Sequence, residues 1–79
     1  MVNTSLDRIE RVEMDFAGLF WTRQNEMIEE MEELDYFVTE ANWEYVVVED
    51  GHDEEDHSYI LYLGHANSTM WIERVRAMD

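Results

Sequence analysis

The stretch Trp43–Glu49, with the sequence WEYVVVE, decides the fold class of this chain. It is rich in β-branched and aromatic residues, which favour the extended backbone of a strand. Ser58–Gly64 (SYILYLG) has the same character, and Met70–Ala77 (MWIERVRA) is a weaker third stretch of this kind. The intervening residues 50–57 and 65–69 are short enough to be hairpin loops. The second half of the chain therefore predicts a three-stranded antiparallel β-meander.

The residues before Trp43 carry a helical pattern. At 100° per residue, seven apolar side chains fall within one narrow stripe. Thr4 or Ser5 is a suitable N-cap, and Gly18 is a natural break, because glycine costs about 1 kcal/mol inside a helix. We expect helix over residues 5–40, as one long helix or two shorter ones. The stripe consists of Ile9, Phe16, Phe20, Met27, Met31, Leu34 and Val38.

An alternative exists for the first part of this segment. Val12, Met14 and Phe16 alternate, and this pattern also suits a short strand that ends at Ala17-Gly18. In either case the fold class is α+β, with an N-terminal helical segment packed on the sheet. The 79 residues contain no proline and no linker, so we expect one small acidic domain over residues 1–79.

A helical segment can cover only one face of the predicted sheet, and both faces of the first two strands are apolar or aromatic. Four aromatic residues are therefore candidates for an interface. We expect at least two of them to lie at a contact with a second copy of the chain or with another partner. They are Trp43, Tyr45, Tyr59 and Trp71.

Charge is the most informative feature of the composition. Twenty acidic residues face five Arg and no Lys, for a formal net charge of −15. Residues 24–73 hold fifteen acidic residues and no Lys or Arg, so they carry the whole net charge. A field of one sign destabilises the folded state by self-repulsion, and it disfavours nucleic acid or anionic lipid as a partner. It favours a cationic partner.

The first acidic cluster consists of Glu26, Glu29, Glu30, Glu32, Glu33 and Asp35. On the predicted helix, four acidic residues lie opposite the apolar stripe: Glu26, Glu29, Glu33 and Glu40. Residues three to four apart on a helix lie about 5–6 Å apart, which gives a ladder of carboxylates close in scale to a nucleic-acid backbone. A solvated helix face is the ordinary interpretation, but such faces usually interleave Lys with Glu, because like charges at this spacing destabilise a helix. The absence of Lys therefore favours a binding surface. Its candidates are Glu26, Glu29, Glu30, Glu33 and Glu40.

The second acidic cluster occupies the predicted hairpin loop: Glu49, Asp50, Asp53, Glu54, Glu55 and Asp56. A solubilising loop is the ordinary interpretation of such a run. The segment does not follow the EF-hand calcium pattern. His52 and His57 could bind a transition metal with Asp53 or Asp56, but exposed loop histidines are more common. We expect neither a metal nor another cofactor.

Catalytic motifs are absent from the sequence. No nucleophile elbow surrounds His57-Ser58, and there is no Walker loop or dinucleotide fingerprint, so we expect no enzyme activity. The chain has no Cys, which suits a reducing cytosol. Its apolar runs are too short to span a bilayer, and its N-terminus lacks a signal-peptide pattern. We therefore expect a cytoplasmic protein.

In size, charge distribution and order of elements, the chain resembles the small phage-encoded acidic inhibitors that imitate nucleic acid. These include anti-CRISPR proteins, anti-restriction proteins and the uracil-DNA glycosylase inhibitor, which also places helix before an acidic antiparallel sheet. The chain is most similar to anti-CRISPR proteins directed at the type I surveillance complex. This resemblance implies occupation of a Lys/Arg-lined DNA channel in the host bacterial cytoplasm, and evasion of host defence.

Two other functions are compatible with the same composition. The acidity of a halophilic or solubility-driven domain serves only to keep it in solution. An acidic partner protein neutralises one basic protein without imitating DNA. Folding at low salt would count against a halophilic domain, whereas competition with DNA would separate mimicry from simple neutralisation.

Overall fold

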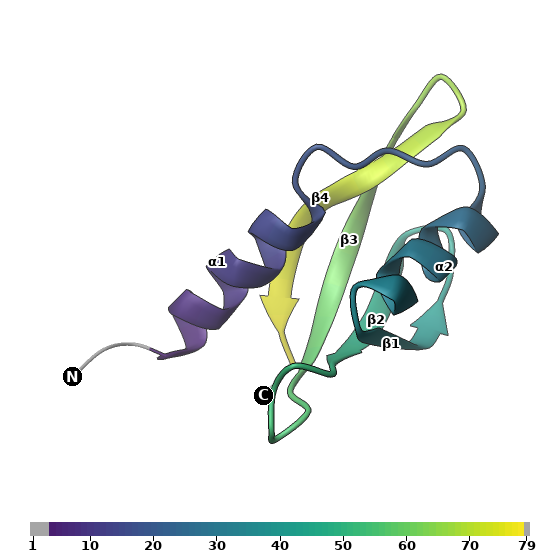
Figure 1. Cartoon of the computed structure of the whole chain (residues 1–79). Helices are drawn as coiled ribbons and strands as arrows, with labels where there is room; N and C mark the ends of the chain where they lie inside the picture. The colour runs from purple at the N-terminus through teal and green to yellow at the C-terminus, as the bar shows by residue number, and fades with distance from the viewer. Residues whose placement is uncertain (1–3, 79) are drawn as a thin grey trace.

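The computed structural model describes residues 4–78, which form two helices followed by a four-stranded sheet (Figure 1). The strands follow one another in the order β1-β2-β3-β4, and every neighbouring pair is antiparallel. The α+β class is therefore confirmed, but the predicted number of three strands is wrong. The elements are α1 (Thr4–Phe16), α2 (Gln24–Glu33), β1 (Tyr36–Ala41), β2 (Tyr45–Asp50), β3 (Ser58–Ala66) and β4 (Thr69–Ala77).

The N-terminal half contains two helices, separated near Gly18. This glycine has a φ of 77°, a left-handed conformation that glycine adopts at no steric cost. The alternative of a strand before it is wrong, because Val12 and Phe16 lie four residues apart on the buried face of α1. Met14, between them, is 76% exposed.

Strand β1 occupies residues for which the apolar stripe predicts helix. Asp35 adopts a φ of 68°, which ends the helical path after α2, and the chain then pairs with β2. Leu34 and Val38 are four residues apart, and this spacing fits a helical period and a strand period of two equally well. The apolar stripe therefore could not separate the two structures. The aromatic pair Tyr36 and Phe37 favours a strand.

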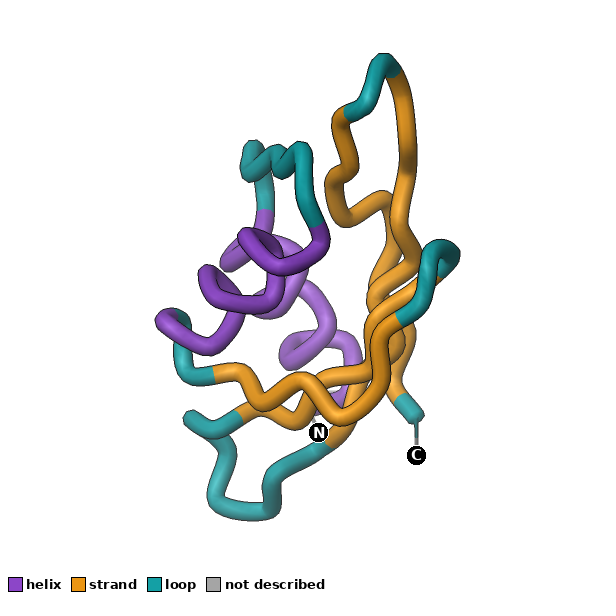
Figure 2. The backbone as a smooth tube through the Cα atoms, turned by 90° about the vertical axis from the view of Figure 1, so that its right-hand side faces the viewer, coloured by secondary structure: helices purple, strands orange, loops and turns teal. Residues whose placement is uncertain are grey.

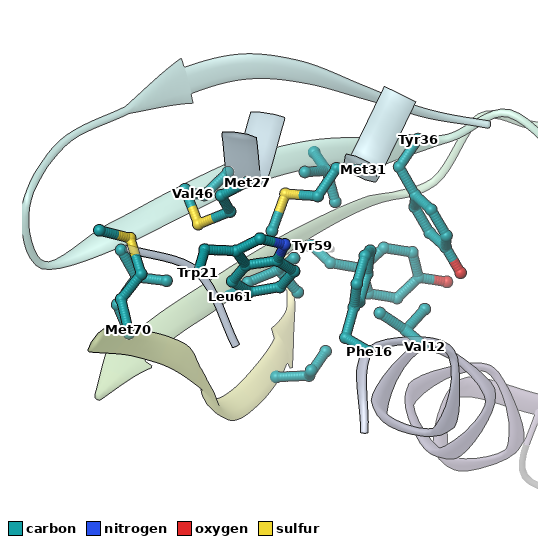
Figure 3. Packing of buried hydrophobic residues seen from close by; sticks show 13 residues of the cluster. Val12, Phe16, Trp21, Met27, Met31, Tyr36, Val46, Tyr59, Leu61 and Met70 are labelled. Carbon is teal, nitrogen blue, oxygen red and sulfur yellow. The ribbon is translucent and has the colours of Figure 1, made fainter. Parts of the chain in front are cut away.

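Both helices lie on the same side of the sheet (Figure 2). Helix α1 packs against β4, and α2 packs against β1. One apolar core fills the space between helices and sheet (Figure 3), with no side chain more than 8% exposed. No helix within residues 4–78 covers the opposite face of the sheet. The buried core consists of Val12, Phe16, Trp21, Met27, Met31, Tyr36, Val46, Val48, Tyr59, Leu61, Leu63, Met70 and Val75.

Candidate acidic interface

Helix α2 presents the carboxylate ladder that its sequence predicts. Met27 and Met31 are fully buried against the sheet, so the opposite side of the helix faces solvent. Glu26, Glu29 and Glu33 are all exposed there, at spacings of three and four residues that place them in one row. Within the described residues, none of the three is in an ion pair.

The charges at the ends of α2 suit its macrodipole only in part: Glu26 in the first turn is favourably placed, but the N-cap and the last turn are not. A helix is stabilised by acidic residues in its first turn and basic residues in its last turn. The N-cap here is Arg23, whose side chain makes no capping hydrogen bond, and the last turn has no basic residue but contains Glu32 and Glu33. Each unfavourable placement costs about 0.3–1 kcal/mol at an exposed position. The arrangement lowers helix stability and concentrates negative charge at the C-terminal end of α2.

The β2–β3 loop, residues 51–57, docks against this same end of α2. The amide N–H of Gly51 donates to the carbonyl oxygen of Asp35 at 2.8 Å, and His52 Nε2 lies 3.2 Å from the carbonyl oxygen of Leu34. A Cβ at position 51 would lie only 2.5 Å from the Asp35 oxygen, so glycine permits this approach. The two acidic clusters, distant in sequence, are therefore contiguous in space.

Within the loop, Asp53 is a structural residue. Its carboxylate accepts a hydrogen bond from the amide N–H of Glu55 at 3.0 Å, and it is also hydrogen-bonded to His57. These two bonds, in that order, lower the pKa of Asp53 below its usual value. Glu54, Glu55 and Asp56 are exposed. The loop thus offers three carboxylates to solvent around one internal carboxylate that fixes its shape.

Asp50 is not part of an exposed surface, which corrects its assignment to the binding site. It is fully buried, and its carboxylate forms an ion pair with Arg11 of α1. Its second oxygen accepts the amide N–H of His52 at 2.9 Å. Burial lowers the pKa of Arg11, but attraction to nearby groups, above all Asp50, outweighs burial and raises it overall. This carboxylate stabilises the fold and cannot contact a partner.

Glu40 does not extend the ladder, because it lies on β1 and not on a helix. A β-bulge between Val38 and Glu40 turns Glu40 away from the core. Its carboxylate accepts the hydroxyl hydrogen of Tyr45 at 2.9 Å, and this hydrogen bond raises the pKa of Tyr45. Glu49 is half-buried on the same sheet and is paired with Phe37.

Glu30 has a packing role on α2. It is half-buried, and it accepts a hydrogen bond from the indole Nε1 of Trp21 at 3.1 Å. In contrast, Glu32 and Asp35 are exposed, and Asp35 lies beside the docked loop, although helical spacing left both out of the predicted binding residues. The sequence feature that could have indicated these two residues is the local density of acidic residues. The candidate acidic interface is therefore Glu26, Glu29, Glu32, Glu33, Asp35, Glu54, Glu55 and Asp56.

The four predicted interface aromatics have different environments. Tyr59 is 1% exposed and belongs to the core, so its assignment to an interface is wrong. Tyr45 and Trp71 are half-buried, and the Trp71 ring lies directly against Gly64. Trp43 is 64% exposed and stacks on the His65 ring with centroids 4.5 Å apart. Trp43 is the aromatic residue best placed to anchor a partner.

The two loop histidines do not assemble a metal centre in the described part of the chain. No group of three or more His, Asp or Glu side chains within it is arranged to hold a metal ion. His52 lies near Asp35, whereas His57 contacts Asp53 and Glu55. Neither described helix combines the length and apolarity needed to cross a membrane.

Comparison of the chain with protein-family models, with curated proteins and with solved structures finds no match.

Proposed function

We propose that this protein is an acidic inhibitor that occupies a Lys/Arg-lined nucleic-acid-binding surface and blocks DNA binding there. One observation carries the proposal: the 51–57 loop, with its exposed carboxylates, contacts the C-terminal end of α2 through Gly51 and Asp35, next to the helix that carries the other exposed carboxylates. Glu32 and Glu33 in the last turn of α2 are unfavourably placed for its macrodipole, so they lower the stability of the helix that presents them. A binding function accounts for that cost better than solubility alone, because solubility needs no particular position for the charges.

Affinity for a basic surface must come from many contacts together. An exposed ion pair contributes only about 0–1 kcal/mol, so eight carboxylates in one surface can supply what one or two cannot. A field of one sign also accelerates encounter with an oppositely charged surface. Trp43 lies outside the acidic interface, in the turn between β1 and β2, and is a candidate anchor for a partner, because Trp residues are common hot spots of interfaces.

The favoured target is a type I CRISPR surveillance complex in the bacterial cytoplasm, with the protein acting as a phage-encoded anti-CRISPR DNA mimic. The basis is the resemblance in size, charge and order of elements. The DNA channel of such a complex is the kind of cationic surface that the carboxylates of α2 fit.

The test is DNA binding by a purified type I surveillance complex with increasing amounts of this protein. The informative variant is Glu26→Lys/Glu29→Lys/Glu33→Lys, which reverses the ladder. The matched control is Asp7→Lys/Glu10→Lys/Glu13→Lys on α1, which changes the net charge equally at other exposed positions. We expect inhibition by the wild type and by the control, and none by the ladder variant. Equal inhibition by all three proteins, or by none, would contradict the proposal.

A further inference from the structure

The face of the sheet that the helices leave uncovered has its own pattern of side chains. Val46 and Val48 belong to the core, so Val47 between them points to the opposite face, as strand alternation requires. Ile60 and Tyr62 on β3 alternate in the same way with the core residues Tyr59 and Leu61. Val47, Ile60 and Tyr62 are absent from the apolar core cluster, although they are buried or half-buried. We call this surface the outer face.

One row of paired residues crosses all four strands on the outer face. Glu40 of β1 pairs with Val47, Val47 pairs with Ile60, and Ile60 pairs with Arg76 of β4. The bulge in β1 is required for this row, because it turns Glu40 outward while Val38 still packs against the core. The row therefore runs from an acidic edge through an apolar centre to a basic edge.

The next row repeats the arrangement. Tyr45 of β2 pairs with Tyr62, and Tyr62 pairs with Arg74. The two Tyr rings lie 6.3 Å apart, and the Arg74 guanidinium lies 4.5 Å above the Tyr62 ring. Tyr45 also donates its hydroxyl hydrogen to Glu40, so the acidic edge is connected to this row as well. Two of the five Arg of the chain thus lie along one edge of this face.

We propose that the outer face is a dimer interface and that its occupant is a second copy of this chain. A two-fold axis that runs parallel to the strands, between β2 and β3, places β1 of one copy over β4 of the other. Each row then lies on the same row of the second copy, with the order of strands reversed. Glu40 of one copy then faces Arg76 of the other, and Val47 faces Ile60. A two-fold axis across the strands would instead place β1 on β1 and β4 on β4, with like charges opposed. The charge pattern therefore selects the first arrangement, which is isologous as a two-fold interface requires.

Other occupants fit this face less well. A basic partner would meet Arg74 and Arg76, and an acidic partner would meet Glu40 and Glu49. The dimer leaves the acidic interface accessible, because α2 packs on the other side of the sheet (Figure 2). Four strands spaced about 4.8 Å apart, about 20 Å long for β1 and β2 and about 30 Å for β3 and β4, offer roughly 500 Å² per copy, below the ~800 Å² of a standard interface. A weak dimer that depends on concentration is the expected form.

The first test is sedimentation equilibrium over a range of protein concentrations at physiological ionic strength, where the Debye length is about 8 Å and the distant acidic surfaces are screened. We expect reversible dimerisation of the wild type. Glu40→Arg or Arg76→Glu alone should weaken it by at least about tenfold, because each opposes like charges. The combined Glu40→Arg/Arg76→Glu variant should restore it. A wild type that stays monomeric, or single variants that dimerise like the wild type, would overturn the proposal.

A second test is independent of the stability of the charge variants. The chain has no cysteine, so Glu40→Cys and Arg76→Cys each introduce a single thiol. Facing sheets lie about 10 Å apart, a distance that a bis-maleimide of similar length spans. A mixture of the two variants should cross-link to dimers far more than either variant alone. Equal cross-linking in all three samples would exclude the proposed axis, and failure of the mixture to cross-link would exclude the interface.

Discussion

The guanidinium of Arg11 on α1 is ion-paired with the carboxylate of Asp50 at the end of β2, although the two residues are 39 positions apart in the chain. The pair ties the first helix to the start of the acidic loop. Asp50 is fully buried, whereas the side chain of Arg11 remains 41% exposed. The ion pair therefore anchors α1 to the sheet, although Asp50 lies within a run of acidic residues in the sequence.

Removal of Arg11 should destabilise the protein. Breaking a buried ion pair from one side costs about 3–5 kcal/mol, and partial exposure of Arg11 places the cost near or below the lower limit. We expect Arg11→Met to lower the free energy of unfolding by about 2–3 kcal/mol, measured by urea denaturation. Arg11→Met/Asp50→Asn should recover part of the loss, because no buried carboxylate then lacks its cation. Additive losses would show that the two residues are not coupled.

High pH should unfold the protein through its buried tyrosines. Burial, and for Tyr36 also its hydrogen bond to Asp15, raise the pKa of Tyr36 and Tyr59. The folded state holds these protons more tightly than the unfolded state. The stabilisation that these two tyrosines provide is therefore fully present below the ordinary tyrosine pKa of about 10. As pH rises above that value, the free energy of unfolding falls by up to ~1.4 kcal/mol per pH unit for each tyrosine.

The measurement is urea denaturation between pH 8 and pH 11, on the wild type and on Tyr36→Phe. The variant should be less stable at pH 8, because it lacks the hydrogen bond to Asp15, but its stability should fall less steeply above pH 10. Identical slopes for the two proteins would contradict the role of Tyr36.

The contact between the acidic loop and α2 should depend on Gly51. A methyl group at this position would lie 2.5 Å from the Asp35 carbonyl oxygen, so Gly51→Ala must displace the loop. We expect a loss of about 1–3 kcal/mol in stability, as for overpacked sites, together with NMR shift changes over residues 32–35 and 51–57.

Gly18→Ala is the control for this variant. Position 18 has a positive φ, but a methyl group added there would meet nothing within 4 Å, so its cost is backbone strain of about 1–2 kcal/mol. The NMR shift changes caused by Gly18→Ala should stay near the turn between α1 and α2. If Gly51→Ala left the shifts of residues 32–35 unchanged, the two acidic clusters would not be joined as described.

The sequence predicted the parts of this fold in which the spacing of apolar residues fits only one period, that of a helix or that of a strand. The strands near Trp43–Glu49, Ser58–Gly64 and Met70–Ala77 occur within a few residues of the expected bounds, and α2 lies in the expected helical segment. Strand β1 was missed because its apolar spacing satisfies both periods, and a single left-handed residue, Asp35, decides between them.

The candidate site was predicted in the same uneven way. The exposed ladder Glu26, Glu29 and Glu33 follows directly from helical spacing. The burial of Asp50 did not follow from composition, because acidic residues surround it in the sequence. The usable signal was alternation: Asp50 continues the inward-facing series of Val46 and Val48. Its partner Arg11 could be found only from the packing of α1.

Binding through the acidic interface should be distributed and sensitive to salt. An exposed ion pair is worth at most about 1 kcal/mol, so Glu29→Gln alone should change the dissociation constant by less than about fivefold. Association with the surveillance complex should slow as salt rises, because the Debye length falls from about 10 Å at 0.1 M to about 3 Å at 1 M. Association rates that do not vary between these salt concentrations would argue against a charge-driven encounter.

Competition between this protein and DNA for one surface is tested most directly by the affinity of the protein for a purified type I surveillance complex, measured with and without saturating target DNA. Fluorescence anisotropy of the labelled protein measures this affinity, and the reversed-ladder variant Glu26→Lys/Glu29→Lys/Glu33→Lys serves as the non-binding control. DNA mimicry predicts that saturating DNA abolishes binding of the wild type and that excess protein restores it. A complex that binds protein and DNA together, each with undiminished affinity, would contradict the account.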